Sequence, residues 1–488
     1  MNALPTLDKS ISHAKNREIK ILQYGEGNFL RGFVEDMFDI ANEKEFFNGN
    51  IVIVKPIPHG NLDLFHQQEC QYTLSLRGME NGKAVQNNRI ITSVADAVSP
   101  YEEYQKYADY AKLDSLRFIV SNTTEAGIVY DETDDFNLLP PNTYPGKLTK
   151  FLYERFLHFG GRNDKGLIII PCELIDNNGI ILKETVLKLI SLWNLGEDFL
   201  SWVENSCTFT LTLVDRIVTG YPKNEAESMW EQLGYRDDLL DTGERFALWV
   251  IEGAEKVKHE FPLDKAGLPV IFTDNHKPYK ERKVRILNGA HTSFVLASFL
   301  AGNNTVLESM QDPEIRCFLE KTIFEEIVPT LSLPEDELKS FAQSVLERFE
   351  NPFIRHELLS IALNSVSKWS VRCMPSLIEY YKRTGKIAPR LSFSLAALLA
   401  FYASGRKTEK GYIGKRGETE YLIQDDEKVI SFFIEHAEQD EKNLVESFIR
   451  TKALRMTALS EIDGLLDSVT QHLVKIRNTD IRSALKSL

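Results

Sequence analysis

The stretch that decides the fold of this chain is Ile19–Gly32, IKILQYGEGNFLRG. Its first part, Ile19–Tyr24, is a short apolar run that is typical of a buried strand. Gly25 then permits a tight turn, Gly27 permits close approach of a ligand to the backbone, and a segment with helical spacing follows. The N–H groups at such a helix start can bind a pyrophosphate. The pattern predicts a strand–turn–helix unit for a dinucleotide, although Leu30 occupies the third glycine position of the usual fingerprint.

The first half of the chain alternates strand-like and helix-like segments. Several apolar runs lack polar alternation, as expected for parallel strands that are covered on both faces. This alternation predicts a Rossmann-like α/β domain with a parallel sheet over residues 1–275. We expect further strands at Ile51–Val54, Arg117–Ser121, Leu167–Pro171 and Thr208–Asp215, and helices at Phe29–Ala41, Tyr101–Leu113 and Lys147–Phe159.

After about Asn275 the strand-like runs nearly vanish and helical periodicity dominates. The chain therefore divides into an α/β half and a mainly helical half, residues 276–488. In the second half we expect helices at Leu287–Ala301, Asp312–Ile327, Pro334–Arg348, Ile354–Trp369, Phe393–Tyr402, Glu427–Glu435 and Ala458–Ile476.

The composition narrows the class of protein. The 488 residues include 57 Lys and Arg against 71 Asp and Glu, a net charge of −14, which argues against nucleic-acid or membrane-surface partners. The N-terminus has no apolar signal segment, and no apolar run reaches the about 18 residues of a membrane span. The five scattered cysteines form no CxxC and the histidines no HxxxH spacing, so we expect reduced thiols and no metal site. These features favour a cytoplasmic protein.

A second informative stretch is Lys283–His291, KVRILNGAH. In a continuous α-helix Lys283, His291 and Asn288 would lie at about 0°, 80° and 140° on one broad face. A carbonyl–alcohol hydride transfer needs a proton donor, which a buried lysine can supply, and neutral hydrogen-bond donors for the oxygen. The residues alone favour a solvated lysine, a capping asparagine and a packed histidine over this catalytic interpretation.

The end of the second expected strand leaves the cofactor type open. An acidic residue there would bind the ribose 2′-hydroxyl, whereas a cation could accommodate a 2′-phosphate. In this chain Ile51–Val54 runs into Lys55 and Pro56. This position therefore does not decide between NAD and NADP.

Four segments in register resemble the mannitol dehydrogenase family, the polyol-specific long-chain dehydrogenases. The resemblance implies an NAD-dependent oxidoreductase that acts on CH–OH groups, with a small-molecule substrate and a chain that can act as a monomer. Within the family, the similarity is greatest to members that act on sugar acids of hexuronate breakdown. The four segments are GEGNFLRG from Gly25, SNTTEAG from Ser121, LVDRI from Leu213 and KVRILNGAH from Lys283. The sugar-acid similarity rests on SNTTEAG, PPNTYPGKLTKFLYERF, IIPCELIDNNG and LNSVSKW.

The resemblance also implies roles for individual residues. Lys283 matches an acid/base lysine, Asn288 an asparagine that stabilises the oxyanion, and His291 a contact to a substrate hydroxyl. Asp215 and Lys368 match substrate contacts. The implied cofactor contacts are Tyr24, Gly25, Glu26, Gly27, Asn28, Phe29 and Arg31 in the first turn, and Asn122, Thr123, Thr124 and Glu125 in a later loop.

Two departures from the family pattern bear on the substrate. Glu173 stands where mannitol dehydrogenases have the aspartate of a Cys-Asp-Asn sequence, and Ser360 stands in place of an arginine eight residues before the lysine. Both positions would face substrate, so the departures fit an altered substrate, and Glu173 joins the substrate-binding candidates. A substrate carboxylate needs a cation; the candidates, which the sequence does not rank, are Lys368, Arg372, His356 and Arg355.

Three other interpretations stay open at this point. The protein could be a family member that acts on a different sugar acid or on a mannitol-type polyol, which a substrate panel would distinguish. It could be an epimerase with a tightly held nucleotide, which would turn over without net loss of NADH. It could be a non-catalytic nucleotide-binding protein, in which Lys283 would have no role.

Overall fold

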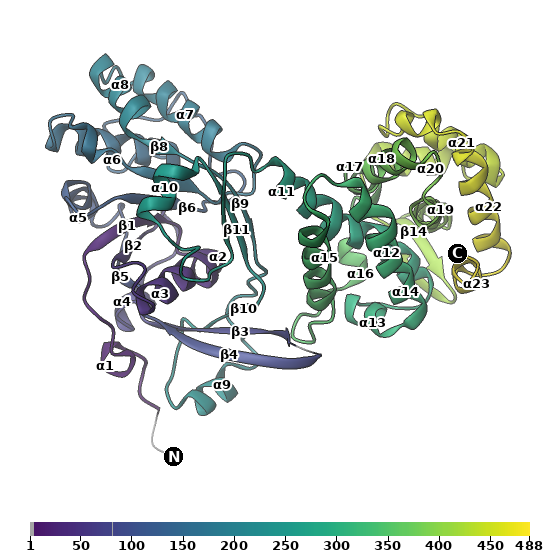
Figure 1. The fold of residues 1–488 in the computed structure, drawn as a ribbon, viewed down its shortest axis with the longest axis horizontal. Coiled ribbons are helices and arrows are strands. Elements are labelled where there is room, and N and C mark those ends of the chain that lie inside the picture. The colour runs from purple at the N-terminus through teal and green to yellow at the C-terminus, as the bar shows by residue number, and fades with distance from the viewer. Residues whose placement is uncertain (1–3, 81) are drawn as a thin grey trace. The chain divides into compact units, whose positions relative to one another are not determined.

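The computed structural model describes residues 4–80 and 82–488, with the backbone only at 254–256. It divides into two compact units, Met1–Arg77 with Val85–His276, and Gly78–Ala84 with Lys277–Leu488. The first unit is an α/β domain and the second is mainly helical (Figure 1). The predicted fold class is confirmed.

The first unit is built on a six-stranded parallel sheet with the strand order β5-β2-β1-β6-β7-β8. The order reverses at β1, so the loops that follow β1, β2 and β6 emerge at one edge of the sheet, where open α/β sheets bind ligands. The strands are β1 (Ile19–Tyr24), β2 (Asn50–Val54), β5 (Val94–Val98), β6 (Phe118–Ser121), β7 (Ile168–Pro171) and β8 (Thr208–Phe209).

Alternate residues of these strands face two different cores. Ile21 and Phe118 pack on one side with the helix that follows the glycine turn, and Leu22 and Ile119 pack on the other side. The second face is covered by α6 (Tyr144–His158), α7 (Asn178–Leu192) and α8 (Glu197–Ser206) (Figure 1). Burial on both faces explains why the strands show no polar alternation in the sequence.

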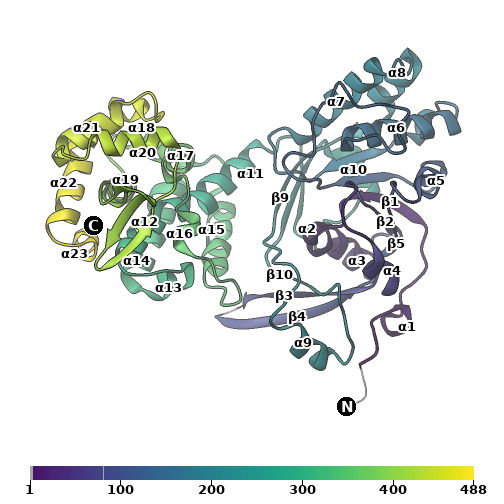
Figure 2. The same cartoon turned by 180° about the vertical axis from the view of Figure 1, so that it is seen from behind.

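Two smaller sheets complete the first unit, and the sequence did not predict the long β3–β4 ribbon (Figure 2). The expected strand Thr208–Asp215 is broken at Thr210: β8 pairs with β7, whereas β9 pairs with β11 in another sheet. The small sheets are β10-β3-β4, of β3 (Tyr72–Glu80), β4 (Lys83–Ile91) and β10 (Asp241–Glu244), and β12-β11-β9, of β9 (Leu211–Asp215), β11 (Leu248–Glu252) and β12 (Val270–Thr273). The other helical segments are α1 (Lys9–Ser12), α2 (Asn28–Leu30), η1 (Arg31–Glu35), α3 (Asp36–Glu43), α4 (Asp63–Gln67), α5 (Tyr104–Asp109), η2 (Tyr110–Lys112), η3 (Asn163–Lys165), α9 (Ala226–Leu233) and α10 (Ala254–Glu260).

The second unit is centred on two almost fully buried helices, α12 (Gly289–Leu300) and α19 (Pro389–Ala403), which pack against each other. Along the described chain, no helix combines the length and the apolar character that a bilayer crossing requires. The remaining elements are α11 (Lys277–Arg282), η4 (Lys283–Asn288), α13 (Val306–Gln311), α14 (Pro313–Lys321), η5 (Thr322–Ile327), η6 (Val328–Thr330), α15 (Glu335–Phe349), α16 (Leu358–Ile361), α17 (Ser365–Arg372), α18 (Met374–Thr384), β13 (Arg406–Thr408), β14 (Gly411–Arg416), β15 (Thr419–Leu422), α20 (Glu427–Glu435), α21 (Glu441–Arg450), η7 (Thr457–Glu461), α22 (Leu465–Asn478) and α23 (Ile481–Leu485).

Two expected helices of this unit are interrupted. The helix expected over Ile354–Trp369 is replaced by α16 and α17, because Asn364 adopts a left-handed backbone with φ of 53°. The helix expected over Ala458–Ile476 is a short 3₁₀ segment followed by α22, with the break at Gly464, where φ is 77°. A left-handed residue cannot continue a right-handed helix, and hydrophobic periodicity does not register it.

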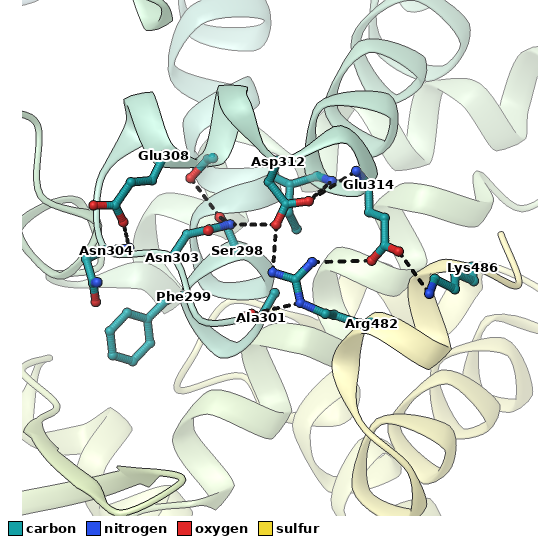
Figure 3. A network of polar contacts seen from close by, with 12 residues as sticks. Ser298, Phe299, Ala301, Asn303, Asn304, Glu308, Asp312, Glu314, Arg482 and Lys486 are labelled. Atoms are coloured by element: carbon teal, nitrogen blue, oxygen red, sulfur yellow. Dashed lines mark hydrogen bonds and ion pairs between the residues drawn. The ribbon is translucent and has the colours of Figure 1, made fainter. Parts of the chain in front are cut away.

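A polar network fastens the C-terminal helix α23 to the body of the second unit (Figure 3). Arg482 donates to Asp312 at 2.7 Å and to the Ala301 carbonyl at 3.0 Å. Asn303 donates to the same carboxylate of Asp312 at 3.0 Å, and Lys486 pairs with Glu314 at 3.0 Å. The end of the described chain is thereby anchored to the loops before α13 and α14.

Candidate active site

The glycine turn after β1 is shaped for close approach. Gly25 has φ of +126°, and a Cβ built on it would lie 3.0 Å from the carbonyl oxygen of Asn122, so a side chain is excluded. Gly27 precedes the helix, no side chain caps the helix there, and a Cβ on Gly27 would meet nothing within 4 Å. The turn therefore offers uncapped N–H groups beside open space, which suits an anion such as a pyrophosphate.

Two of the residues expected to contact the cofactor have side chains inside the first unit. Arg31 is buried and donates to the Leu239 carbonyl at 2.6 Å and to the Asn28 side chain at 2.5 Å. Tyr24 is buried, with its hydroxyl 2.6 Å from that of Tyr107. These two buried side chains anchor the residues that flank the turn. Glu26 is half-buried, which raises its pKa, and Phe29 is half-exposed and stacks on Phe33 at 5.1 Å.

The loop after β6 is held by Glu173, which follows β7. Its carboxylate accepts hydrogen bonds from the Thr123 N–H at 3.1 Å, the Thr123 hydroxyl at 3.0 Å and the Ser121 hydroxyl at 3.1 Å. Asn122 donates to the Cys172 carbonyl at 2.6 Å. Burial raises the pKa of Glu173, and the hydrogen bonds from Thr123 and Ser121 oppose that shift. The acid expected to face substrate is thus engaged with the loop.

The exposed part of that loop consists of Thr124, Glu125 and Ala126. Thr124 adopts a left-handed backbone with φ of 84°. Asp215 ends β9 and is buried in the same unit. Its neighbour Arg216, which the sequence did not single out, forms a buried ion pair with Asp36 at 2.8 Å and so ties β9 to α3.

In the second unit, Lys283 and Asn288 lie in a π-helical segment, η4, and not in the continuous α-helix assumed from the sequence. A π-helix joins residue i to residue i+5 by a backbone hydrogen bond, so Lys283 and Asn288 lie about one turn apart and point in closer directions than α-helical spacing gives. Both side chains and that of His291 are half-buried, while their neighbours Arg285, Ile286 and Leu287 are buried. Single-turn π segments occur often at functional sites.

A cationic cluster of Lys368 and Arg372 lies beside His291 and His356. The His291 ring stacks on Phe349 with centroids 4.1 Å apart and lies 5.2 Å from the His356 ring. Burial holds the pKa of His291 well below its usual value, and the positive charges of Arg348, Arg372 and Lys368 lower it further. The imidazole of His291 is therefore neutral at pH 7 and can donate or accept a hydrogen bond.

The candidate residues thus fall into two sets, one in each unit. The glycine turn, the loop after β6, Glu173 and Asp215 belong to the first unit; Lys283, Asn288, His291, Lys368 and Arg372 belong to the second. Among residues 4–80 and 82–488, no three His, Cys, Asp or Glu side chains form a group that could hold a metal ion.

Comparison with protein families matches both units. Residues 19–265 match the mannitol dehydrogenase Rossmann domain, and residues 275–476 match the mannitol dehydrogenase C-terminal domain. Relatives named altronate oxidoreductase include one from Yersinia enterocolitica, 44% identical over 99% of both chains, and one from Shigella flexneri, 45% identical over 96% of both chains.

Solved structures share the fold. A substrate-free D-sorbitol dehydrogenase covers 98% of this chain and 100% of its own with a TM-score of 0.79 and 21% identity. The Pseudomonas fluorescens mannitol 2-dehydrogenase, a ternary complex with NAD and D-mannitol, covers 99% of both chains with a TM-score of 0.66 and 21% identity. With both units matched in order and near-complete relatives above 40% identity, this chain belongs to the mannitol dehydrogenase family.

Proposed function

We propose that this protein is an NAD(H)-dependent altronate oxidoreductase, or tagaturonate reductase, that interconverts D-altronate and D-tagaturonate. The observation that carries the proposal is the near-full-length identity of 44–45% to relatives of that name. The placement of Lys283, Asn288 and His291 on one short helical stretch supports it. In the reducing direction D-tagaturonate, NADH and a proton give D-altronate and NAD⁺.

We assign cofactor binding to residues 1–275. The uncapped helix start after Gly27 and the exposed loop residues Thr124 and Glu125 fit a dinucleotide laid across the carboxyl edge of β1 and β6. When bound, NADH supplies a hydride to the keto carbon of the substrate. Arg31 and Glu173 act as positioning residues, because their polar atoms already bond to the turn and to the loop.

We assign the proton transfer to residues 276–488. The Lys283 ammonium donates its proton to the oxygen that becomes the new hydroxyl, and the Asn288 amide donates a hydrogen bond to the same oxygen as its charge develops. Neutral His291 hydrogen-bonds a neighbouring substrate hydroxyl. We assign a further substrate-hydroxyl contact to Asp215 from the family resemblance.

A substrate panel tests the proposal. Initial rates of NADH oxidation are measured for the full chain with D-tagaturonate, D-fructuronate and D-fructose, each with NADH and with NADPH. We expect the highest kcat/KM for D-tagaturonate with NADH. A higher kcat/KM for D-fructuronate or D-fructose would reassign the enzyme within the family. Conversion of substrate without net loss of NADH would replace the reductase with an epimerase.

The family resemblance also leads us to propose a monomer that works in the cytoplasm. Light scattering coupled to size exclusion should give a mass near 55.8 kDa. A mass near twice that value would contradict the monomer. Fractionation of the native cells tests the compartment.

A further inference from the structure

We propose that Arg372 and Lys368, with His356 beside them, bind the carboxylate of the substrate and set the preference for sugar acids over neutral sugars. The inference deepens the proposed function and rests on it. It also ranks the four cations that the sequence left equivalent.

The first observation is that Lys368 and Arg372 lack a carboxylate partner. They lie four residues apart on α17, and both are half-buried. Lys368 donates to the Ile361 carbonyl at 2.9 Å, and Arg372 donates to the Thr292 hydroxyl at a long 3.4 Å. Within residues 4–80 and 82–488, no ion pair includes either of them. Like charges at this spacing destabilise a helix, and an anion between them would remove that repulsion.

Several other arginines of the second unit pair with acids, among them Arg383, Arg390 and Arg482. Arg383 pairs with Glu379 at 2.7 Å, four residues before it on the same helix, which is the arrangement that Lys368 and Arg372 lack. The acid that acts on Lys368 through its charge, Asp425, is engaged elsewhere: it accepts hydrogen bonds from the Tyr402 hydroxyl and from the Val366 N–H. Burial lowers the pKa of Lys368 most, and the positive charge of Arg372 lowers it further. This is expected for two neighbouring cations that have no ion-pair partner among the described residues.

The second observation concerns the histidines beside the pair. The Nε2 atom of His291 is buried and has no hydrogen-bond partner in the structure. Burial lowers the pKa of His356 as well as that of His291, so both rings are neutral at pH 7. They therefore offer N–H donors, and not further charge, next to two cations.

The third observation places Arg372 at the catalytic stretch. A Cβ on Gly289 would lie 3.1 Å from the Arg372 carbonyl oxygen, and the Cys373 thiol donates to the Gly289 carbonyl at 3.5 Å. The end of α17 therefore packs on the residue that follows Asn288. We therefore expect a six-carbon acid whose keto group reacts beside Lys283 and Asn288 to extend its carboxylate toward this cluster.

Arg355, the remaining candidate for binding the carboxylate, is already paired with an acid and is exposed to solvent. Its side chain is 81% exposed and pairs with Glu357 at 2.6 Å. Arg372 is the better carboxylate ligand, because a half-buried guanidinium can form two parallel hydrogen bonds to a carboxylate. Arg355 serves as the matched control.

The test compares R372M, R372K, K368M and R355M with the wild-type enzyme, with D-tagaturonate and the neutral ketose D-fructose at saturating NADH. We expect R372M to lower the ratio of kcat/KM for the acid to that for the ketose by about 100-fold, mainly through KM. K368M should lower this ratio by about 10-fold, and R372K should recover part of the loss. R355M should leave the kinetics of D-tagaturonate within twofold of wild type.

A second readout does not depend on turnover. Adding D-altronate with NADH, a pair that cannot react, should raise the pKa of His356, followed by the NMR signal of its ring C–H, because an anion is bound beside it; in R372M the rise should be lost. If the wild type reduces D-tagaturonate while R372M and K368M keep the acid-to-ketose ratio within twofold, the carboxylate assignment is wrong and the proposed function stands. If the wild type does not use D-tagaturonate at all, the proposed function fails, and the NMR titration still decides whether the cluster binds a sugar acid.

Discussion

Gly289 packs directly on Arg372: a Cβ at position 289 would come within 3.1 Å of the Arg372 carbonyl oxygen. Glycine therefore permits the close approach of α12 and α17 that brings the cationic cluster to the stretch of Lys283 and Asn288. Gly289 has φ of −66°, so the need for glycine here is contact and not backbone conformation.

Replacing Gly289 by alanine should therefore push the end of α17 away from α12. It should not weaken α12 itself, because the backbone of Gly289 is already helical. We expect G289A to raise KM for D-tagaturonate by about 10-fold, a loss of about 1.4 kcal/mol of binding free energy. The dissociation constant for NADH, measured by fluorescence titration, should not change, because that site is assigned to the other unit. An unchanged KM would mean that the contact is relaxed without consequence for the substrate.

Removing the ammonium of Lys283 tests the proton transfer. K283M should lower kcat with D-tagaturonate by about 10²–10⁴-fold, the range for loss of a general acid, with NADH affinity nearly intact. The exposed Lys321 on α14 provides the control, and K321M should behave as wild type. Loss of NADH binding in K283M with unchanged turnover would contradict the assignment.

Glu173 should act on the cofactor through the loop after β6. E173Q removes a charged acceptor of three hydrogen bonds, each of which stabilises the positions of Ser121 and Thr123. A hydrogen bond to a charged group is worth about 1.5–3 kcal/mol, so the dissociation constant for NADH should rise at least about 10-fold. E184Q, an exposed glutamate of α7, is the control. A larger effect on KM for the sugar acid than on NADH binding would instead place Glu173 at the substrate.

The ammonium of Lys55 should not serve a 2′-phosphate. It is buried and donates to the carbonyl groups of Gly60 and Pro58, so it shapes the loop after β2. We expect kcat/KM for NADH to exceed that for NADPH by at least about 10-fold. K55M should lower the melting temperature and NADH affinity without reversing this preference. Equal use of both cofactors would show that another cation accepts the phosphate.

Asp241 should make stability depend on pH. Burial raises its pKa to about 7, with Arg31 opposing the shift, and its Oδ2 atom is buried without a hydrogen-bond partner. In the unfolded chain the carboxyl titrates near about 3.9. The folded protein therefore binds the proton more tightly, and the contribution to stability that is present below pH 4 is lost as the pH rises to 7.

The variant D241N should remove this slope. Between pH 4 and pH 7 the free energy of unfolding of wild type should fall relative to D241N by about 2–4 kcal/mol, measured by denaturant titration at several pH values. D198N, in which an exposed aspartate of α8 is changed, should follow wild type. Parallel curves for wild type and D241N would show that folding does not raise the pKa of Asp241.

The sequence predicts the Rossmann-like sheet well because its signals are local. The strand Ile19–Tyr24 agrees with β1 at both ends, and the apolar runs at β2, β6 and β7 agree within one residue at each end. Continuous burial on both faces and the glycine turn are properties of neighbouring residues. The β3–β4 ribbon was not predicted because β3 pairs with β10, which is distant in the sequence, and β4 is mostly exposed and shows no regular alternation.

The identity of the chemical groups was likewise determined by the sequence, through Lys283, Asn288 and His291 and through the turn from Gly25 to Asn28. What each group contacts was decided only by tertiary structure. The π-helical segment brings Lys283 and Asn288 closer in direction than an α-helix would, Glu173 bonds to the loop after β6, and Arg372 rather than Arg355 is left without a carboxylate. Spacing along a chain fixes which side chains can share a helix face. The choice among cations of equal charge depends on burial and on the acids nearby in space, and these arise only when helices distant in sequence pack together.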